Sequence, residues 1–585
     1  MTRAVAGPAR RERAPRPVRR RAGGRRADAL ILAGYALAAV AVLKNLWASP
    51  SGRYLVDGGP DQNQWEWFFA VTARAVTRLE NPLFTTLQNH PDGVNLMGNT
   101  VMLGVSVPLA PLTLACGPGA TWAVVLTSGL AGTAAGWYRL VRRHLGGSRP
   151  AAAVGGAFCG FAPPIVTHAN AHPNFVALFV LPFLVGRLVM LARGGRPLRD
   201  GAVLGLLAAY QIHMGEEALL LAATALVPFA AVYAVSRPDA ARAAARPLLA
   251  GLAVALAVSA PLSAYPLWWQ FAGPRSYDGL LHGPSGNDVA VLAAFARQSL
   301  AGHPAPPGPL DVSTTEQNAF FGWTVVVLVA VLLVWLRRLP LARALGAVVV
   351  TGVLLSLGPE IVVNGEPTGV PGPWRWTARL PLYESVLESR LTMTCVPAIG
   401  LLVALGVDRL RARAPAEGPR LCAVVLALAL VPVVPKPLPA EPRRKVPAFF
   451  TDGTWRRHVS PGRALVPVPL PGAGDAEPLH WQVRSGLGFP VPEGYFVGPF
   501  GPRREGGYGA EPRPTSRLLR RAADDGPPPV GDAERAAARA DLAYWRADAV
   551  VLGPHPRGEH LRATVEALLG PGVREGGVWV WRVRP

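Results

Sequence analysis

Two acidic residues stand near the start of a long polar segment, residues 49–99, which separates two apolar runs. Asp57 is followed by Gly-Gly-Pro, which favours a turn, and Pro60 suits the first position of a helix with Asp61 just inside it. A carboxylate in this place would act as a general base toward a hydroxyl group. It would equally complement the positive end of the helix dipole. We predict Asp61 as the catalytic residue, with Asp57 as its rival and as a substrate contact.

The helix that Asp61 would begin is amphipathic. Trp65, Phe68, Phe69 and Thr72 follow Asp61 at helical spacing. Aromatic side chains along one face are typical of a helix that lies in the plane of a membrane surface, with its rings among the lipid headgroups. We therefore expect this helix on the outer membrane surface, where the phosphate of a lipid-linked substrate would reach its first turn.

Five further polar residues are candidates for contact with a substrate. His90 and Asp92 lie in a second polar stretch of the same segment, although an Asp-Gly pair also favours a plain turn. Glu216 and Glu217 stand between two apolar runs, where acidic residues are costly and mark functional sites. Arg390 opens an apolar run and would hold a phosphate through its planar guanidinium, unless it only extends to the headgroups. We predict all five as substrate-binding residues.

Two histidines flank another turn, and we predict that they do not bind a metal. His168 and His172 have no acidic residue close to them in the sequence, and Pro173 favours a helix that starts directly after His172. They are interpreted as a polar rim instead. The chain also lacks a Walker A loop, an HExxH motif and a Rossmann glycine fingerprint. We therefore expect no cofactor, and we expect any activated donor to be linked to a lipid.

The composition places these residues in a membrane protein. Of the 585 residues 50% are hydrophobic and only 16% are charged, whereas a soluble chain carries about 25% charged residues. The formal charge of +22 would suggest nucleic acid. However, ten arginines gather in the tail before Asp28, and many other basic residues lie in short loops between apolar runs. That pattern is typical of a positive-inside membrane protein, so we predict no nucleic-acid partner.

The apolar runs predict a bundle of transmembrane helices. A span needs about 20 residues, and the candidates are Ala29–Trp47, Trp122–Leu140, Ala151–Val166, Phe175–Leu191, Ala202–His213, Ala218–Val235, Leu248–Trp268, Trp323–Trp335, Leu341–Leu357, Leu391–Val407 and Leu421–Val434. A weaker run, Met97–Cys116, contains two prolines and is predicted to be re-entrant or interfacial. We expect eleven spans, with twelve as the alternative. The basic tail puts the N-terminus in the cytoplasm, so with eleven spans the C-terminus is external, in a multi-pass protein of the plasma membrane.

Three regions follow from these patterns: a basic cytoplasmic tail (1–28), a transmembrane region (29–435) with its external loop (49–99), and a C-terminal region (436–585). The last region begins with a Pro-rich linker. It then alternates predicted strands and helices, which are typical of a small external α/β domain: strand Arg463–Pro471, helix Asp532–Arg546, strand Ala547–Gly553, helix Leu561–Leu569 and strand Gly577–Val583. The fold class is therefore mainly α, with this small α/β addition.

Several stretches resemble the GT-C superfamily of membrane glycosyltransferases. GPDQNQWEWFF looks like the first external loop of that superfamily, in which an aspartate is the usual catalytic base. HANAHPNFVALFVLPF and LPLYESVLESRLTMTCVPAIGLLVALGVDRL are also similar to its members, and WQVRSGLGFPVPEGYFVGP resembles their external appendage. The resemblance implies a sugar donor linked to polyprenyl phosphate and a glycan, lipid or protein acceptor. It gives Asp61 the role of base and makes Arg390 a candidate for the donor phosphate.

The resemblance has one departure, and two other functions stay open. Members that depend on a divalent metal often carry two adjacent acids, or acids one residue apart, in the first loop, whereas Asp57 and Asp61 are four residues apart. This spacing argues against a metal requirement. A transporter or lipid flippase would use His213, Glu216 and Glu217 as a proton path. A non-catalytic scaffold would use its outer region to bind partners in the cell envelope.

Overall fold

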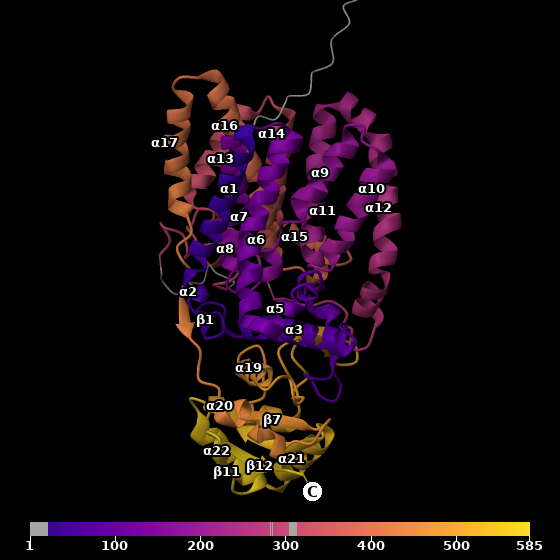
Figure 1. The fold of residues 1–585 in the computed structure, drawn as a ribbon, viewed down its shortest axis with the longest axis vertical. Helices are drawn as coiled ribbons and strands as arrows, with labels where there is room; N and C mark the ends of the chain where they lie inside the picture. Colours follow the sequence, from indigo (N-terminus) through magenta and orange to yellow (C-terminus); the bar gives the residue numbers. More distant parts are fainter. Residues whose placement is uncertain (1–21, 281, 284, 304–312, 585) are drawn as a thin grey trace, which may run out of the picture.

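The computed structural model describes residues 22–280, 282–283, 285–303 and 313–584. Figure 1 shows a set of long helices and, beyond one end of them, a smaller C-terminal part that contains a β-sheet. Helix α3 (Gly59–Arg78) lies across the ends of the long helices, between the two parts. The residues predicted to do chemistry at the start of α3 therefore lie near the junction of the two parts.

The long helices of the described chain run roughly parallel to one another (Figure 1). They are α1 (Ala22–Val42), α6 (Pro118–Leu140), α7 (Arg149–Phe161), α9 (Leu181–Ala192), α10 (Pro197–Ile212), α11 (Glu216–Ser236), α12 (Pro238–Ala272), α13 (Trp323–Leu336), α14 (Pro340–Ser356), α16 (Cys395–Arg413) and α17 (Gly418–Leu430). Each apolar run predicted as a span coincides with one of them. Among the described residues, the helices long and apolar enough to cross a membrane by themselves are Glu216–Ser236, Pro238–Ala272 and Glu388–Arg413. The number of spans stays a prediction.

Small residues allow these helices to pack closely. A Cβ atom added to Gly155 of α7 would lie 2.6 Å from the carbonyl oxygen of Gly400 in α16. A Cβ atom added to Gly201 of α10 would lie 2.5 Å from the carbonyl oxygen of Gly251 in α12. Glycine at such crossings lets two helix backbones touch, which is how membrane helices commonly associate.

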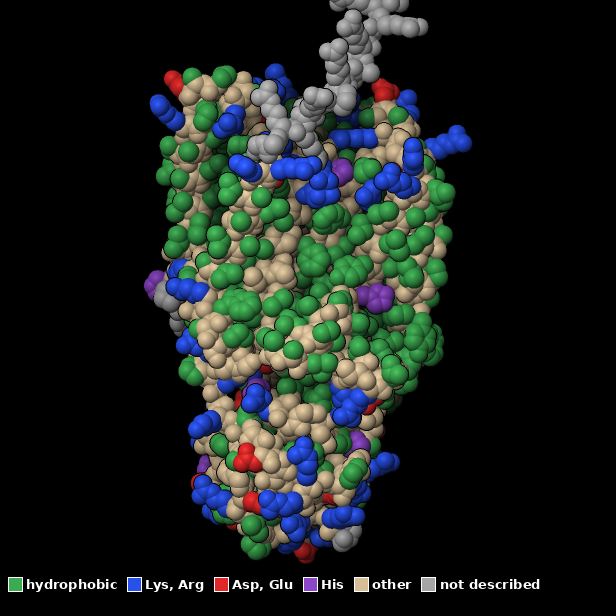
Figure 2. Space-filling view, in the orientation of Figure 1, with side chains coloured by type: hydrophobic (Ala, Val, Ile, Leu, Met, Phe, Trp, Pro, Cys, Tyr) green, Lys and Arg blue, Asp and Glu red, His purple; other side chains and the backbone are tan. Residues whose placement is uncertain are grey.

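The surface agrees with a membrane location. In Figure 2 a belt of hydrophobic side chains covers the long helices, and Lys and Arg side chains gather above this belt and over the C-terminal part below it. The connections α6–α7, α9–α10, α11–α12, α13–α14 and α16–α17, which carry the basic loops, lie at the end opposite to α3 (Figure 1). An apolar belt between two polar ends is the surface that a bilayer-spanning protein presents.

The prediction that α3 places its aromatic rings among the lipid headgroups is wrong. The rings are inside the protein, because Trp65 is 5% exposed, Phe68 1% and Phe69 0%. Helix α3 is covered by α5 (Ala110–Cys116) and α6 on one side and by α19 (Glu477–Arg484) of the C-terminal part on another. The apolar face of α3 therefore packs against protein, which holds the helix and Asp61 in a fixed position.

The weaker apolar run, Met97–Cys116, is not one continuous helix. It is divided into η1 (Met97–Asn99), α4 (Leu103–Ser106) and α5. The longest piece, α5, has 7 residues and is about 10 Å long at 1.5 Å per residue, far short of a bilayer. This breakage agrees with the expected interfacial or re-entrant segment, whereas α6 is continuous over 23 residues.

Short elements connect the long helices. They are α2 (Lys44–Trp47), β1 (Arg53–Leu55), β2 (Phe84–Thr85), β3 (Val94–Asn95), η2 (Val141–Leu145), α8 (Pro163–His168), η3 (Pro173–Phe175), η4 (Val289–Leu292), β4 (Glu360–Val363), β5 (Glu366–Pro371), α15 (Trp374–Thr377), η5 (Tyr383–Ser385), η6 (Glu388–Thr394) and η7 (Val431–Val433). Strand β1 pairs antiparallel with β6 (Ala440–Pro442), in register from Arg53 opposite Pro442 to Leu55 opposite Ala440. This pairing ties the linker after α17 to the segment that leads into α3.

The C-terminal part contains a four-stranded mixed sheet in the order β11-β12-β10-β7. Its elements are α18 (Ala448–Thr451), η8 (Thr454–Arg457), β7 (Ala464–Val468), α19, β8 (Val497–Phe500), β9 (Glu505–Tyr508), α20 (Pro514–Asp524), α21 (Asp532–Tyr544), β10 (Ala547–Leu552), α22 (Gly558–Leu569), β11 (Val573–Glu575) and β12 (Val578–Arg582). Strands β7 and β10 are parallel, and β12 runs antiparallel to β10. Every strand and helix predicted here from the sequence is present. The elements α18, α19, α20, β11 and the β8–β9 hairpin were not predicted from the sequence.

Candidate functional site

Asp61 lies in the first turn of α3, where the chain has just turned sharply through Gly58 and Gly59. One oxygen of its carboxylate accepts a hydrogen bond of 2.5 Å from the hydroxyl of Tyr495, a residue of the C-terminal part. Burial raises the pKa of Asp61 above its usual range, although His172 in its protonated form, the Tyr495 hydrogen bond and the charge of Arg390 act in the opposite direction. A carboxylate with a raised pKa is a stronger base, as general-base chemistry requires.

Arg390 is held between two carboxylates from distant segments. Its Nη1 atom lies 2.9 and 3.1 Å from the two carboxylate oxygens of Glu217, and its Nη2 and Nε atoms lie 2.5 and 3.3 Å from those of Glu316. The guanidinium also stacks 4.6 Å from the centre of the Phe175 ring. Only 12% of the Arg390 side chain is exposed, so these contacts fix its orientation. The charges of Arg390 and Glu316 both act on the pKa of Asp61.

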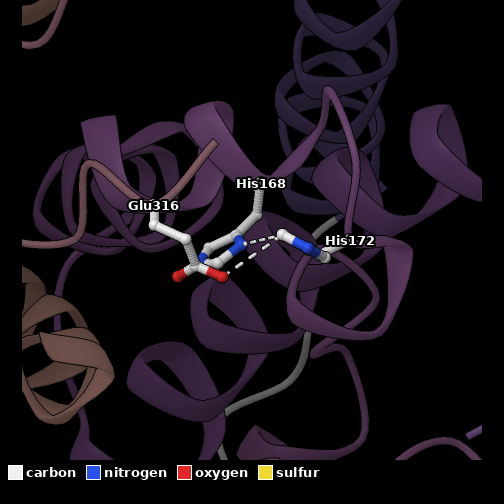
Figure 3. Close-up of side chains that lie close together, drawn as sticks. All are labelled: His168, His172 and Glu316. Carbon is white, nitrogen blue, oxygen red and sulfur yellow. Dashed lines mark hydrogen bonds and ion pairs between the residues drawn. The ribbon is translucent and has the colours of Figure 1, made fainter. Parts of the chain in front are cut away.

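Two histidines complete this cluster (Figure 3). The Nδ1 atoms of His168, at the end of α8, and of His172 are 3.0 Å apart, so one of them donates a hydrogen bond to the other. His168 Nε2 lies 2.8 Å from the side-chain oxygen of Asn318, whose amide nitrogen donates to Glu316. Glu316 is also 3.6 Å from His172 and 3.7 Å from His168. No acidic residue is close to these histidines in the sequence, but Glu316 reaches them from a distant loop.

The donor atoms of His168, His172 and Glu316 all lie within 4.8 Å of one another. Burial lowers the pKa of His172 to about 4, against the opposing charge of Glu316, so its ring is neutral at pH 7. Burial would raise the pKa of Glu316, but Arg390 and the two histidines together hold it well below its usual range. A neutral imidazole and an ionised carboxylate are the protonation states that a metal requires. Two histidines and one carboxylate also form a ligand set suited to a transition-metal ion. These residues therefore fit a divalent cation, which the sequence had left doubtful.

The net charge of the site also favours a bound divalent cation. When ionised, Asp61, Glu217 and Glu316 carry three negative charges, against one positive charge on Arg390. The phosphate of a lipid-linked donor would meet this excess of negative charge, and in a partly buried site such repulsion is large. A divalent cation would neutralise the excess.

Other predicted site residues lie apart from this cluster, each with its own partner. The carboxylate of Asp57 is 3.0 Å from Arg297 and 2.6 Å from the side-chain amide of Gln298, and it is 6% exposed. Glu216 accepts a hydrogen bond of 2.7 Å from Gln270 in α12. Asp57 and Glu216 are therefore held by partners outside the cluster, and their predicted contacts with a substrate stay predictions.

The proton path considered for a transporter is interrupted in this conformation. His213 Nδ1 contacts the carbonyl oxygen of Ala209 at 2.8 Å, within its own helix turn. Glu217 contacts Arg390, and Glu216 contacts Gln270. The three groups therefore have three separate partners instead of forming one hydrogen-bonded chain.

His90 and Asp92 are brought together elsewhere, in a cavity between the first long loop and the C-terminal part. Asp92 accepts a hydrogen bond of 2.8 Å from the hydroxyl of Tyr544 at the end of α21. Both residues thus reach the C-terminal part, whereas Asp61 reaches it through Tyr495.

Glu316 and Tyr495 were not predicted as site residues from the sequence. Glu316 stands in the polar stretch STTEQN, directly before an apolar run, and this was the available signal. Tyr495 lies in the stretch that resembled the external appendage, but no local pattern connects it to Asp61. Both contacts depend on segments that meet only in the folded chain.

The comparisons with known proteins agree with this architecture. Neither a family model nor a curated protein matches the sequence. Among solved structures, the chain is similar to the arabinofuranosyltransferase AftD from Mycobacteria, with a TM-score of 0.56 and 16% identity over 96% of this chain and 40% of that one. It is similar to the oligosaccharyltransferase AglB from Archaeoglobus fulgidus, in complex with an inhibitory peptide and a dolichol-phosphate, with a TM-score of 0.50 and 13% identity over 93% of this chain and 70% of that one.

The apo form of the Archaeoglobus fulgidus oligosaccharyltransferase is also similar, with a TM-score of 0.52 and 13% identity over 90% of this chain and 69% of that one. The chain thus spans less than half the length of AftD and about 70% of the oligosaccharyltransferase. At these identities the likeness concerns the fold, which extends over nearly the whole of this chain. The chain therefore shares the fold of these solved structures over nearly its whole length.

Proposed function

We propose that this protein is a glycosyltransferase that moves a sugar from a polyprenyl-phosphate-linked donor to an acceptor at the outer face of the plasma membrane. The observation that carries the proposal is the convergence of Asp61, Arg390 and Glu316 with two histidines at the end of the helices where α3 lies. A base, a phosphate-binding cation and a candidate metal-ligand set are the groups that transfer from a lipid phosphate requires.

In the proposed reaction an acceptor hydroxyl attacks the anomeric carbon of the donor sugar. Asp61 takes the proton of that hydroxyl as the new C–O bond forms. The bond between the anomeric carbon and the phosphate oxygen breaks, and the lipid phosphate leaves with the bonding electron pair. Because burial raises the pKa of Asp61, its carboxylate is suited to this proton transfer near neutral pH.

Arg390 would stabilise the negative charge that grows on the departing phosphate. Its two carboxylate partners hold the guanidinium in place before the donor arrives, so little reorganisation is needed. A divalent cation held by His168, His172 and Glu316 would supply further positive charge for the same phosphate. In this arrangement Glu217 acts as a positioning residue for Arg390.

The proposed orientation follows from the charge of the loops. The basic connections lie at one end of the long helices and α3 lies at the other. The positive-inside rule assigns the basic end to the cytoplasm. The Asp61 cluster and the C-terminal part are therefore proposed to lie outside, where a donor already carried across the membrane would be used.

The test compares Asp61→Asn with Asp57→Asn in cells that lack the natural protein. Polyprenyl-phosphate sugars are extracted and identified by mass spectrometry. We expect one such lipid to accumulate without the protein, to disappear with the wild type and to persist with Asp61→Asn. Asp57→Asn should relieve the accumulation in proportion to the amount of folded protein, because Asp57 contacts Arg297 and lies outside the cluster. Full relief by Asp61→Asn would overturn the proposal.

A further inference from the structure

A second polar site lies between the first long loop and the C-terminal part. It is a cavity of about 580 Å³, a size typical of sites for small organic ligands. Segments far apart in the sequence form its wall: the loop around His90, the stretch after α12 that contains Arg275, the hairpin β8–β9, and the ends of α20 and α21. A cavity made by several segments has a geometry that the whole fold maintains.

Buried polar groups in this wall lack partners. His90 is 8% exposed; the backbone of Thr86 interacts with its ring, but neither ring nitrogen makes a hydrogen bond of normal geometry within the described chain. The Nε atom of Arg275 is in the same condition. Leaving such groups unpaired destabilises the fold, so a structure that keeps them favours a ligand that pairs with them.

The backbone of the wall is strained in the same places. Asn89, Arg275, Glu493 and Arg504 all have positive φ angles, of 52°, 58°, 55° and 55°. Residues other than glycine rarely adopt this backbone conformation, and strained residues of this kind cluster at binding sites and active sites. Strain and unpaired polar atoms thus coincide in one cavity.

The chemistry of the wall identifies the class of ligand. Arg275, Arg504 and Arg513 face the cavity together with three acids, Asp92, Glu493 and Glu511, so neither sign of charge prevails. The carboxylates would repel a polyanion. Sugar hydroxyls both donate and accept hydrogen bonds, so they can pair with the acids and with the arginines. The ring of Tyr544 adds a partly exposed aromatic surface. The Arg513 guanidinium lies 4.1 Å from the centre of that ring, and the Tyr544 hydroxyl is bonded to Asp92.

The cavity is connected to Asp61 through one short stretch of chain. The backbone oxygen of Glu493 accepts a hydrogen bond of 2.7 Å from Asn89, and Tyr495, two residues later, donates to Asp61. Two residues span at most about 7 Å. Gly494 lies between Glu493 and Tyr495, and a Cβ atom added there would collide with Gln88. This stretch is therefore closely packed against the first long loop.

We infer that this cavity binds a neutral oligosaccharide, the part of the acceptor next to the hydroxyl that reacts at Asp61. The inference rests on the proposed function, and it narrows the acceptor from a glycan, lipid or protein to a glycan. His90 and Arg275 supply hydrogen bonds to its hydroxyl groups, and Tyr544 supplies a ring surface.

The test measures binding to the full-length protein in lipid nanodiscs. The probes are neutral and acidic oligosaccharides, separated after mild acid hydrolysis of the envelope polysaccharide of the producing cells and labelled at the reducing end with 2-aminobenzamide. We expect the wild type and Asp61→Asn to retain neutral fragments. His90→Ala and Arg275→Met should each weaken retention about tenfold or more, since each removes a hydrogen-bonding group. Arg539→Met, an exposed position of α21 outside the cavity, serves as the matched control.

The outcomes separate this inference from the proposed function. The inference would be overturned, even with sugar transfer intact, by any of three results. Neutral fragments fail to bind the wild type, both folded cavity variants bind them as tightly as the wild type does, or the wild type prefers acidic fragments. Binding as expected, by a protein that transfers no sugar from lipid extracts, would leave the cavity assignment standing and remove the proposed function. Thermal unfolding of each variant verifies that it is folded, and Arg275→Met provides the test if His90→Ala does not fold.

Discussion

Replacing Arg390 by methionine should damage both the stability and the activity of the protein. The change leaves Glu316, which is 6% exposed, and Glu217, which is 23% exposed, without their shared cation. Removing one partner of a buried ion pair costs about 3–5 kcal/mol, mostly because the remaining charge is buried and unpaired. Two carboxylates lose their partner here, so we expect at least ~3 kcal/mol. A loss of this size lowers the folding equilibrium constant by more than about a hundredfold.

The same reasoning predicts a partial rescue. Arg390→Met combined with Glu217→Gln and Glu316→Gln removes the unpaired charges, so the triple variant should regain most of the lost stability. It should not regain sugar transfer, because the cation proposed to contact the phosphate is still absent. Stability is measured by denaturant titration of the detergent-solubilised protein, followed by the fluorescence of its 16 tryptophans. If the free energy of unfolding of Arg390→Met lay within about 0.5 kcal/mol of the wild-type value, the ion pairs of Arg390 would behave as solvent-exposed pairs and the reasoning would be refuted.

Three further results are expected. Tyr495→Phe removes a hydrogen bond that lowers the pKa of Asp61, so the acidic limb of the transfer rate should move to higher pH; an unmoved limb would contradict Asp61 as the base. His172→Ala should bind much less Zn²⁺ or Mn²⁺ than the wild type after loading and desalting, measured by elemental analysis, and equal metal content would contradict the metal site. Arg443→Met should destabilise the protein by about 3–5 kcal/mol in denaturant titrations, because Arg443 and Glu66 form an ion pair in which each side chain is 3% exposed; a change below 1 kcal/mol would contradict this.

Most of the long helices could be predicted from the amino-acid sequence. Apolar runs of suitable length predicted the long helices, because a membrane helix satisfies its backbone internally and must present an apolar surface along its length. The start of α3 was predicted at Pro60 and Asp61, since a proline there costs no hydrogen bond. Strands β10 and β12 were also predicted, because short apolar runs bounded by turn residues are a local signal.

The tertiary structure decided which groups share the site. Arg390 and Glu217 are 173 residues apart in the chain, and Asp57 and Arg297 are 240 apart, yet both pairs form ion pairs. No periodicity or spacing in the sequence predicts such a pairing, because the pairing forms only when the packed helices bring their connecting loops together. For the same reason Asp57 stayed a rival of Asp61 in the sequence, although the folded chain pairs the first with Arg297 and the second with Tyr495.

The aromatic face of α3 shows the same division. Its spacing correctly indicated a helix with one apolar face, since local periodicity depends only on the helix turn. The partner of that face was decided by the fold, which covers it with α5, α6 and α19 instead of lipid. Local sequence thus determined where the helices and strands form. The charge, burial and catalytic potential of each side chain depended on distant segments that only the folded protein brings together.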